Sequence, residues 1–241
     1  LLGPGKRGID RRALERSADT LVHRGPDDSG SFVSQDGRYG VGFRRLSIIA
    51  PKGGHQPLVS SDGDICVTVN GEIYNHASLR SELEGLGHRY RTGSDSEAIL
   101  HGYEEWGDAV VDRLHGMFAL AVFDGRQNGA GRLLLARDRL GVKPLYHCST
   151  SDGLVFGSEI KAILAWPGVT PEVDNLALGH YLTLSATPAP ATMFEGIFKL
   201  QPGHVLTVDP DGQVETSAYW TPTSGGVDLG DASEQEMATL V

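Results

Sequence analysis

Residues 65–75 read Ile-Cys-Val-Thr-Val-Asn-Gly-Glu-Ile-Tyr-Asn, a hydrophobic run that passes into polar residues. The run at residues 65–69 is rich in β-branched side chains, so it predicts a buried strand. Asn70-Gly71 follows directly, and Asn-Gly is a frequent turn sequence. At the end of a strand, however, the Asn amide and the next backbone N–H can point in one direction, which is how an oxyanion hole is built. The residues alone leave both interpretations open, and in the second Glu72 could hold a substrate ammonium group.

Strand and helix signals lie on both sides of this stretch. Two short strands, residues 30–33 and 39–43, are expected to form a hairpin through Asp36-Gly37. Further strands are expected at residues 117–123, 133–136, 145–148, 154–156, 205–208 and 213–219. Helices are expected at residues 10–22, 75–86, 94–106, 159–164 and 175–184. The order of hairpin, helical block and strands predicts an α+β fold, in which two sheets pack face to face under helices.

Three of these helices carry capping signals. Asp10 and Asn75 are expected to cap the first and second helices, because their side chains can accept a backbone N–H. Ser94 and Glu97 form a capping-box pattern at the start of the third helix. Asp95, between them, can complement the helix dipole or can face a ligand.

The composition argues against several classes of protein. The 241 residues carry 21 Lys and Arg against 31 Asp and Glu, and a net charge of −10 disfavours nucleic acid and anionic membranes as partners. No apolar run is long enough to suggest a membrane span. Two cysteines cannot form a disulfide scaffold, so a reducing, cytoplasmic compartment is expected. The nine histidines show no metal-ligand spacing, and Cys66 is expected to be a buried structural thiol.

A second candidate binding group lies at the end of the predicted hairpin. Arg45 stands beside an apolar stretch, in the string Arg44-Arg45-Leu46-Ser47-Ile48-Ile49. Its guanidinium can bind a carboxylate through two hydrogen bonds, or it can lie on the surface of an edge strand. An arginine, an acidic pair and an oxyanion donor together suit a ligand with an α-carboxylate, an α-ammonium and a reactive carbonyl. An amino acid with a side-chain amide fits that description.

Six blocks of sequence, in a fixed order, carry a resemblance to a known family. They are Arg24-Gly25-Pro26-Asp27, Arg45-Leu46-Ser47-Ile48, Asn70-Gly71-Glu72-Ile73-Tyr74-Asn75, Gly93-Ser94-Asp95, residues 136–146 and Ser158-Glu159-Ile160-Lys161-Ala162. Together they resemble the glutaminase domain, a class II glutamine amidotransferase, of glutamine-hydrolysing asparagine synthetases. The resemblance covers about residues 1–220. The third block resembles asparagine synthetase rather than the sugar-phosphate or phosphoribosyl amidotransferases.

The resemblance implies a fold and a reaction. The fold is a four-layer αββα sandwich of the N-terminal-nucleophile hydrolase type. In that family an N-terminal cysteine attacks the side-chain amide of glutamine, and its own α-amine serves as the general base. Ammonia then travels to a C-terminal domain, which activates aspartate with ATP and Mg²⁺ and completes asparagine biosynthesis. The implied partners are glutamine, that C-terminal synthetase domain and, as one assembly to test, a second copy in a homodimer.

The resemblance also assigns roles to single residues. Asn70 and the backbone N–H of Gly71 are the expected oxyanion hole. Arg45 is expected to bind the glutamine α-carboxylate, and Asp95 with Glu72 the α-ammonium. Backbone contacts to glutamine are expected from Leu46, Ser47, Ile48 and Ile49. No metal site is expected in this segment.

The chain departs from the family at its start. The family's opening string, roughly Met-Cys-Gly-Ile-Ala-Gly, would stand immediately before Leu1, so we expect the sequence to be a segment that lacks the nucleophile. Residues 221–241 are expected to be a linker and the start of a truncated ATP-dependent synthetase domain. Two alternatives stay open. The domain could be a silent scaffold, as in β-lactam synthetases, or an amino-acid-binding regulatory domain.

Overall fold

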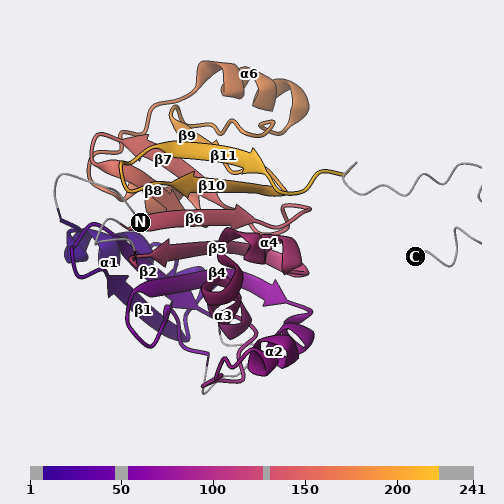
Figure 1. The fold of residues 1–241 in the computed structure, drawn as a ribbon. Coiled ribbons are helices and arrows are strands. Elements are labelled where there is room, and N and C mark those ends of the chain that lie inside the picture. The colour runs from indigo at the N-terminus through magenta and orange to yellow at the C-terminus, as the bar shows by residue number, and fades with distance from the viewer. Residues whose placement is uncertain (1–7, 47–53, 127–130, 223–241) are drawn as a thin grey trace, which may run out of the picture.

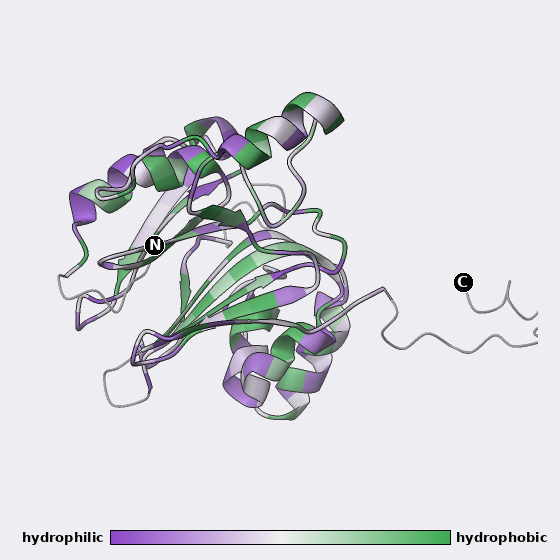
Figure 2. Cartoon of the chain, turned by 90° about the horizontal axis from the view of Figure 1, so that it is seen from above, coloured by the Kyte–Doolittle hydropathy of each residue, from purple (hydrophilic) through white to green (hydrophobic). Residues whose placement is uncertain are grey.

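A computed structural model of the chain describes residues 8–46, 54–126 and 131–222. Within these residues two β-layers pack against each other, and helices cover both outer faces (Figure 2). The predicted α+β sandwich is therefore confirmed. No helix in these ranges is both long and apolar enough to cross a bilayer. The linker predicted at residues 221–241 falls almost entirely outside the described residues and stays a prediction.

The first β-layer is an antiparallel sheet of six strands in the order β11-β10-β6-β5-β4-β3 (Figure 1). Its strands are β3 (Leu58–Val59), β4 (Ile65–Ile73), β5 (Gly116–Asp124), β6 (Arg132–Arg137), β10 (His204–Val208) and β11 (Val214–Ala218). The central pair β4 and β5 is in register from Ile65 opposite Asp124 to Ile73 opposite Gly116. These central strands are hydrophobic on both faces because each face is covered by another layer.

The second β-layer consists of a hairpin and a three-stranded sheet. The hairpin pairs β1 (Asp28–Val33) with β2 (Gly40–Arg45), and the sheet has the order β8 (Gly153–Gly157), β7 (Tyr146–Thr150), β9 (Ile197–Lys199). Side chains of both layers form one hydrophobic cluster, in which the Tyr39 ring stacks on Phe123 with ring centroids 4.5 Å apart. Cys66 lies in this cluster, as the sequence predicts.

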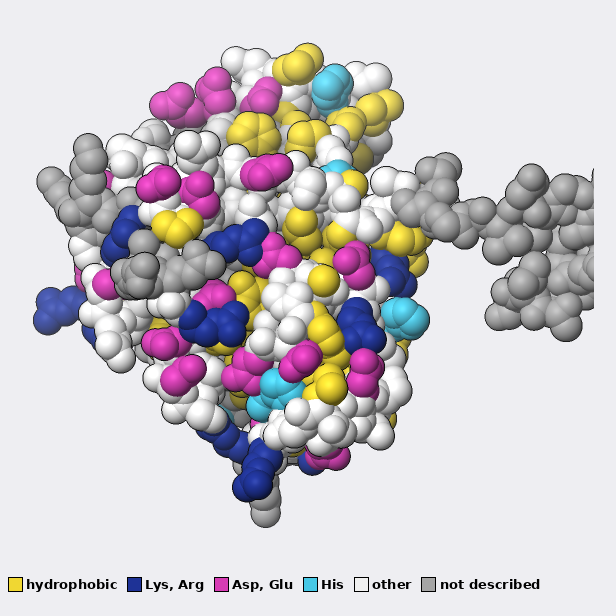
Figure 3. All heavy atoms as spheres, viewed as in Figure 1, with side chains coloured by type: hydrophobic (Ala, Val, Ile, Leu, Met, Phe, Trp, Pro, Cys, Tyr) yellow, Lys and Arg dark blue, Asp and Glu magenta, His cyan; other side chains and the backbone are white. Residues whose placement is uncertain are grey.

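Helices close both outer faces of the sandwich. Against the large sheet pack α2 (His76–Gly85), α3 (Glu97–Trp106) and α4 (Val110–Arg113), and Figure 1 shows α3 in front of β4. The short turn η2 (Gly107–Ala109) joins α3 to α4. The second layer is covered by α1 (Arg11–Asp19), η1 (Val22–Arg24) and α5 (Ile160–Leu164). The last helix, α6 (Asn175–Leu184), exposes Leu176 and Leu182, and hydrophobic side chains gather at the top of Figure 3, where Figure 1 places α6.

Of the predicted caps, that of α1 is confirmed and two are wrong. Asp10 accepts a hydrogen bond from Arg12 N–H, as expected. Asn75 precedes α2, but its side chain instead contacts the segment ahead of β5, where it donates to the Arg113 carbonyl and accepts from the His115 N–H, both at 2.9 Å. The Ser94 capping box is absent, because α3 begins at Glu97 and the Glu97 carboxylate accepts hydrogen bonds from residues that precede Ser94. At Asn75 and Glu97, hydrogen bonds to residues outside the helix replace the caps that the local sequence pattern predicts.

Candidate active site

The structure brings the predicted site residues of its described part to one cavity of about 340 Å³. The cavity lies where β2, β4 and the segment before α3 meet. The predicted residues on its wall are Arg45, Leu46, Asn70, Gly71, Glu72 and Asp95. The remaining predicted positions, Ser47, Ile48 and Ile49, lie outside the described residues.

Successive side chains of β4 point to opposite faces of the sheet, and the polar ones face this cavity. The side chains of Val67, Val69 and Ile73 pack under the helices, whereas Cys66 packs between the two β-layers. Thr68, Asn70 and Glu72 follow Cys66 at every second position, so they face the space between the layers and line the cavity. The strand therefore continues through Asn-Gly to Ile73, and both the predicted strand end at residue 69 and the turn interpretation are wrong.

Gly71 lets the backbone of β4 pass unusually close to β5. A Cβ atom at this position would lie 2.0 Å from the Met117 carbonyl oxygen, and the φ angle of +155° is one that side chains disfavour. The residue opposite is Phe118, whose N–H and carbonyl both bond to Asp138 on the other side of β5. Gly71 and Phe118 therefore form a non-hydrogen-bonded pair, and the Gly71 N–H is directed away from β5.

On that side of β4, fixed polar groups bracket Gly71. The Gln56 side-chain amide mimics a strand, because it accepts from the Val69 N–H at 2.8 Å and donates to the Val69 carbonyl at 3.1 Å. Beyond Gly71, the Ile73 N–H donates to Asp95 Oδ2 at 2.8 Å. The backbone on both sides of Gly71 is thus held in place, which fixes the direction of its N–H.

Asp95 is buried and lies two residues before α3. Its Oδ2 binds β4, and its Oδ1 lies 3.5 Å from the Ser94 hydroxyl and 3.4 Å from the Ser96 hydroxyl. The carboxylate is therefore oriented by β4 and by its two serine neighbours toward the cavity. Asp95 lines the cavity, and its ligand-facing role stays a prediction.

The side-chain amide of Asn70 contacts a residue that follows β8 of the second β-layer. Its Nδ2 lies 3.4 Å from the hydroxyl oxygen of Ser158, which precedes α5 and also lines the cavity. That contact is long, so a stronger acceptor can replace it. Ser158 belongs to a sequence block quoted above, but nothing in its local spacing assigns it a role. Gln56 and Thr68 were missed likewise, because their contributions depend on the pairing of strands.

The charges around the cavity are of both signs. Arg45 is only 9% exposed at the end of β2, while Glu72 and Asp95 contribute carboxylates from the neighbouring wall. At the rim, the Arg24 guanidinium donates to Glu159 at 3.1 Å. A cavity with a buried guanidinium near two carboxylates suits a zwitterion better than a singly charged ligand.

Comparisons with known proteins show which family the chain belongs to. A family described as "Glutamine amidotransferase domain" matches residues 3–220. The chain belongs to this family. The glutamine amidotransferase domain is 40% identical to asparagine synthetase [glutamine-hydrolyzing] 3 of Bacillus subtilis, across 89% of this chain and 34% of that protein. It is 39% identical to a putative asparagine synthetase [glutamine-hydrolyzing] of Mycobacterium tuberculosis, across 86% of this chain and 33% of the relative. The chain thus spans about a third of the length of these relatives, and the resemblance stated from the sequence blocks is confirmed.

Solved structures show the same fold. An allosteric regulatory enzyme of purine biosynthesis aligns with a TM-score of 0.62 at 19% identity, covering 87% of this chain and 46% of the other. The glutamine phosphoribosylpyrophosphate amidotransferase of B. subtilis aligns with a TM-score of 0.59 at 18% identity, with the same coverage. Both support the αββα architecture of the glutamine amidotransferase domain.

A loop after β6 holds Lys143 at the wall of the cavity. The buried Asp138 carboxylate accepts hydrogen bonds from the backbone N–H groups of Leu140, Val142 and Lys143, at 2.9 to 3.1 Å. The Arg137 guanidinium donates to three backbone carbonyls around the same loop, and burial lowers its pKa. This loop belongs to the block at residues 136–146, for which no role is predicted from the sequence.

Neither cysteine of the amidotransferase domain lines the cavity. Cys66 and Cys148 are both buried, and burial raises the pKa of each thiol. A thiol with a raised pKa is a poor nucleophile at neutral pH. The prediction that Cys66 is structural is confirmed.

Proposed function

We propose that this chain is the glutaminase part of a longer, ATP-dependent amide-forming enzyme. It would hydrolyse the side-chain amide of glutamine and supply the ammonia to a second domain. One observation carries the proposal. The Asn70 amide and the Gly71 N–H adjoin a cavity that also contains the buried Arg45 and Asp95.

Glutamine binding follows from the charges of this cavity. The Arg45 guanidinium binds the α-carboxylate, and Asp95 with Glu72 binds the α-ammonium. Both ends of the amino acid are then fixed, so its side-chain amide extends toward β4. Because Asp95 is held by the Ile73 N–H at 2.8 Å, the ammonium site is ordered before the ligand arrives.

The reaction develops negative charge on the side-chain carbonyl oxygen of glutamine. Attack at the amide carbon converts this oxygen into an oxyanion, which the Asn70 Nδ2 and the Gly71 N–H stabilise. These donors lie on adjacent residues of a paired strand and need no reorganisation, which is the feature that makes such donors effective.

In the family's reaction the nucleophile is an N-terminal cysteine. Its thiolate forms a bond to the amide carbon, the C–N bond breaks, and the α-amine returns its proton to the departing ammonia. A free α-amine has a pKa of about 7.7–8.0, which suits proton transfer near neutral pH. Water then hydrolyses the thioester and releases glutamate. Leu1, and not a cysteine, stands first in this sequence, and neither Cys66 nor Cys148 lines the cavity, so this step rests on the family.

The partner that uses the ammonia follows from the relatives. They are glutamine-hydrolysing asparagine synthetases about three times as long as this chain. We expect a synthetase domain that uses ATP and Mg²⁺ after residue 220, with aspartate or another carboxylate as acceptor.

Two versions of the chain test the proposal. In the first, the chain is extended at its N-terminus with Met-Cys-Gly-Ile-Ala-Gly; in the second, Ala replaces the Cys of that extension. Glutamate release from L-glutamine is measured, and calorimetry compares the binding of L-glutamine and L-asparagine. We expect the Cys version to hydrolyse L-glutamine, and the Ala version to bind it without hydrolysis.

The possible failures separate the alternatives. Binding without hydrolysis by the Cys version would support a silent or regulatory domain. No binding of L-glutamine by either version would overturn the assignment of the cavity.

A further inference from the structure

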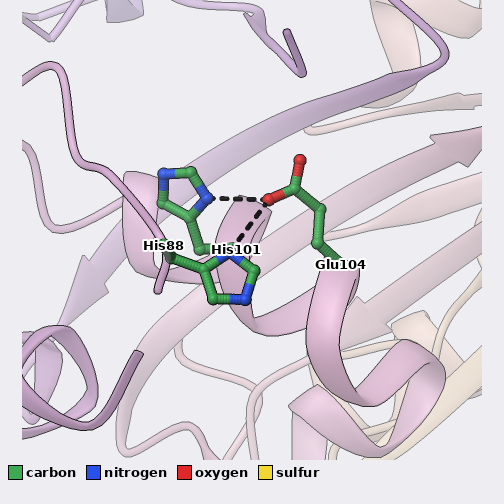
Figure 4. A group of neighbouring side chains, drawn as sticks. All are labelled: His88, His101 and Glu104. Atoms are coloured by element: carbon green, nitrogen blue, oxygen red, sulfur yellow. Dashed lines mark hydrogen bonds and ion pairs between the residues drawn. The ribbon is translucent and has the colours of Figure 1, made fainter. Parts of the chain in front are cut away.

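A second polar cluster lies on the opposite face of the large sheet, at α3. It contains His88, which follows α2, and His101 and Glu104, which lie one turn apart on α3 (Figure 4). Glu104 Oε2 is 2.7 Å from His101 Nδ1 and 3.3 Å from His88 Nδ1. One ligand atom from each residue lies within 4.8 Å of the other two.

We propose that His88, His101 and Glu104 bind a Zn²⁺ ion. Two imidazole nitrogens and one carboxylate oxygen are a preferred ligand set for zinc. Ligand atoms at about 2.0–2.2 Å from a tetrahedral ion lie about 3.4 Å from one another. The contact between His88 and Glu104 already has this length, and that between His101 and Glu104 needs to open by about 0.7 Å.

The Nε2 atom of each imidazole, which would point away from the ion, also lies near a carboxylate, as is usual for histidines that bind a metal. His88 Nε2 lies 3.1 Å from Glu105 Oε2, and His101 Nε2 lies 3.5 Å from Glu97 Oε1. Histidines that bind zinc through one nitrogen usually donate the other N–H to a carboxylate, which fixes the tautomer and the ring orientation. Each histidine here has one carboxylate on the metal side and another on the outer side.

His101 supplies an independent observation. Its Nε2 is buried and, in the described part of the chain, makes no hydrogen bond, although Glu97 is near. A buried polar atom without a partner is costly. Zinc on Nδ1 would place the imidazole proton on Nε2, and after a small shift this N–H can donate a hydrogen bond to the Glu97 carboxylate. The ion would therefore give His101 Nε2 the hydrogen-bond partner that it lacks.

The ion would join the segment that precedes α3 to the helix itself. His88 opens that segment, and Asp95 lies near its end. Between them, the N–H groups of Arg91 and Thr92 donate to Glu97 at 2.6 and 2.8 Å. Zinc would thus stabilise the segment that carries Asp95 and would contact nothing in the cavity. This inference concerns the metal alone and does not depend on glutamine hydrolysis.

Metal binding to the chain without any cysteine extension tests the site. The protein is treated with chelator and dialysed. Zn²⁺ is then titrated by calorimetry, and Co²⁺ by its visible absorption. We expect one ion per chain, a Co²⁺ spectrum of low coordination number, and a higher unfolding temperature with Zn²⁺.

Variants separate the site from other histidines. Glu104→Gln and His88→Gln change partly exposed side chains and keep their size, and each should weaken Zn²⁺ binding by about 10-fold or more. His204→Gln removes a histidine on β10 and should leave the affinity unchanged. Equal affinity in the Glu104→Gln variant and the unaltered chain, or no saturable binding at all, would overturn the proposal.

Discussion

Asp95 Oδ2 accepts a hydrogen bond from the Ile73 N–H at 2.8 Å, across 22 residues of sequence. This bond attaches the segment before α3 to the edge of β4, so the proposed ammonium site and the proposed oxyanion hole lie in one cavity. The hydrogen bond to strand β4 therefore fixes the position of the Asp95 carboxylate. A helix cap would have left it directed at the first turn of α3 instead.

The oxyanion role makes a prediction for Asn70. In the chain that carries an N-terminal Cys extension, Asn70→Ala should lower kcat for glutamine hydrolysis by about 10²–10³-fold, because one preorganised donor is lost. KM should change little, since the oxyanion forms only after binding. Steady-state kinetics of glutamate release measure both constants.

Ser158→Ala is the matched control for that variant. It removes the long contact with Asn70 Nδ2 but leaves the Asn70 amide in place. We expect kcat within about threefold of the unaltered chain, an effect of under 1 kcal/mol. If Asn70→Ala had no larger effect than Ser158→Ala, the oxyanion role of Asn70 would be rejected.

Arg45 is predicted to act on binding. A guanidinium that holds the α-carboxylate contacts a group that does not change during the reaction, so Arg45→Ala should raise KM about 10-fold or more with little change in kcat. Arg38→Ala is the control, because the Arg38 guanidinium donates to the Pro210 carbonyl and does not line the cavity. An unchanged KM in Arg45→Ala, or an equal rise in both variants, would count against the carboxylate role.

The sequence predicted the layers well because the strands have strong patterns. Residues 117–123 and 133–136 are apolar throughout, and both are central strands covered on two faces. Residues 65–69 predicted β4, but its continuation to Ile73 was missed. β4 continues past Gly71 because it stays paired with β5, and the local sequence pattern gives no information on which strands pair.

The sequence predicted which residues belong to the candidate site, but it did not predict how the fold arranges them around the cavity. The ordered blocks pointed to Asn70, Arg45 and Asp95, which the structure brings to one cavity. Gln56 was missed because its side chain takes the place of a neighbouring strand. The His88 cluster was missed for a similar reason. Its members show no metal-ligand spacing in sequence, and the fold of the segment after α2 brings them together.

Gly71 should tolerate no side chain. In Gly71→Ala the new Cβ would lie 2.0 Å from the Met117 carbonyl oxygen, so β4 and β5 would have to separate where Asn70 enters the cavity. We expect the free energy of unfolding to fall by about 3 kcal/mol, and glutamine hydrolysis to be lost.

Gly85→Ala in α2 is the control, because a Cβ there meets nothing within 4 Å. It should stabilise the chain by about 0.5–1 kcal/mol. Urea unfolding measures both, and equal stability of the two variants would contradict the predicted clash.

Asp124, at the end of β5, should make stability depend on pH. Burial by itself would raise the pKa of Asp124, but the side chain and the backbone N–H of Arg126 donate to it and hold its pKa below the usual range. The carboxylate is thus favoured in the folded state. Its contribution to stability should be complete above about pH 4, the pKa of an Asp in unfolded chains, and should be lost as pH falls through the lower folded pKa.

Asp124→Asn tests this dependence, since it keeps the shape and removes the charge. At pH 7 it should lower the free energy of unfolding by about 2 kcal/mol, the range for a hydrogen bond to a charged group. The difference from the unaltered chain should shrink as pH falls below 4, because Asp124 becomes neutral first in the unfolded chain and then, at lower pH, in the folded chain. Asp211→Asn, at an exposed turn, should stay within about 0.5 kcal/mol of the unaltered chain at every pH. Urea unfolding at pH 7 and near pH 3 gives the comparison. A deficit in Asp124→Asn that is equally large at both pH values would show that packing, and not the charge of Asp124, makes the contribution.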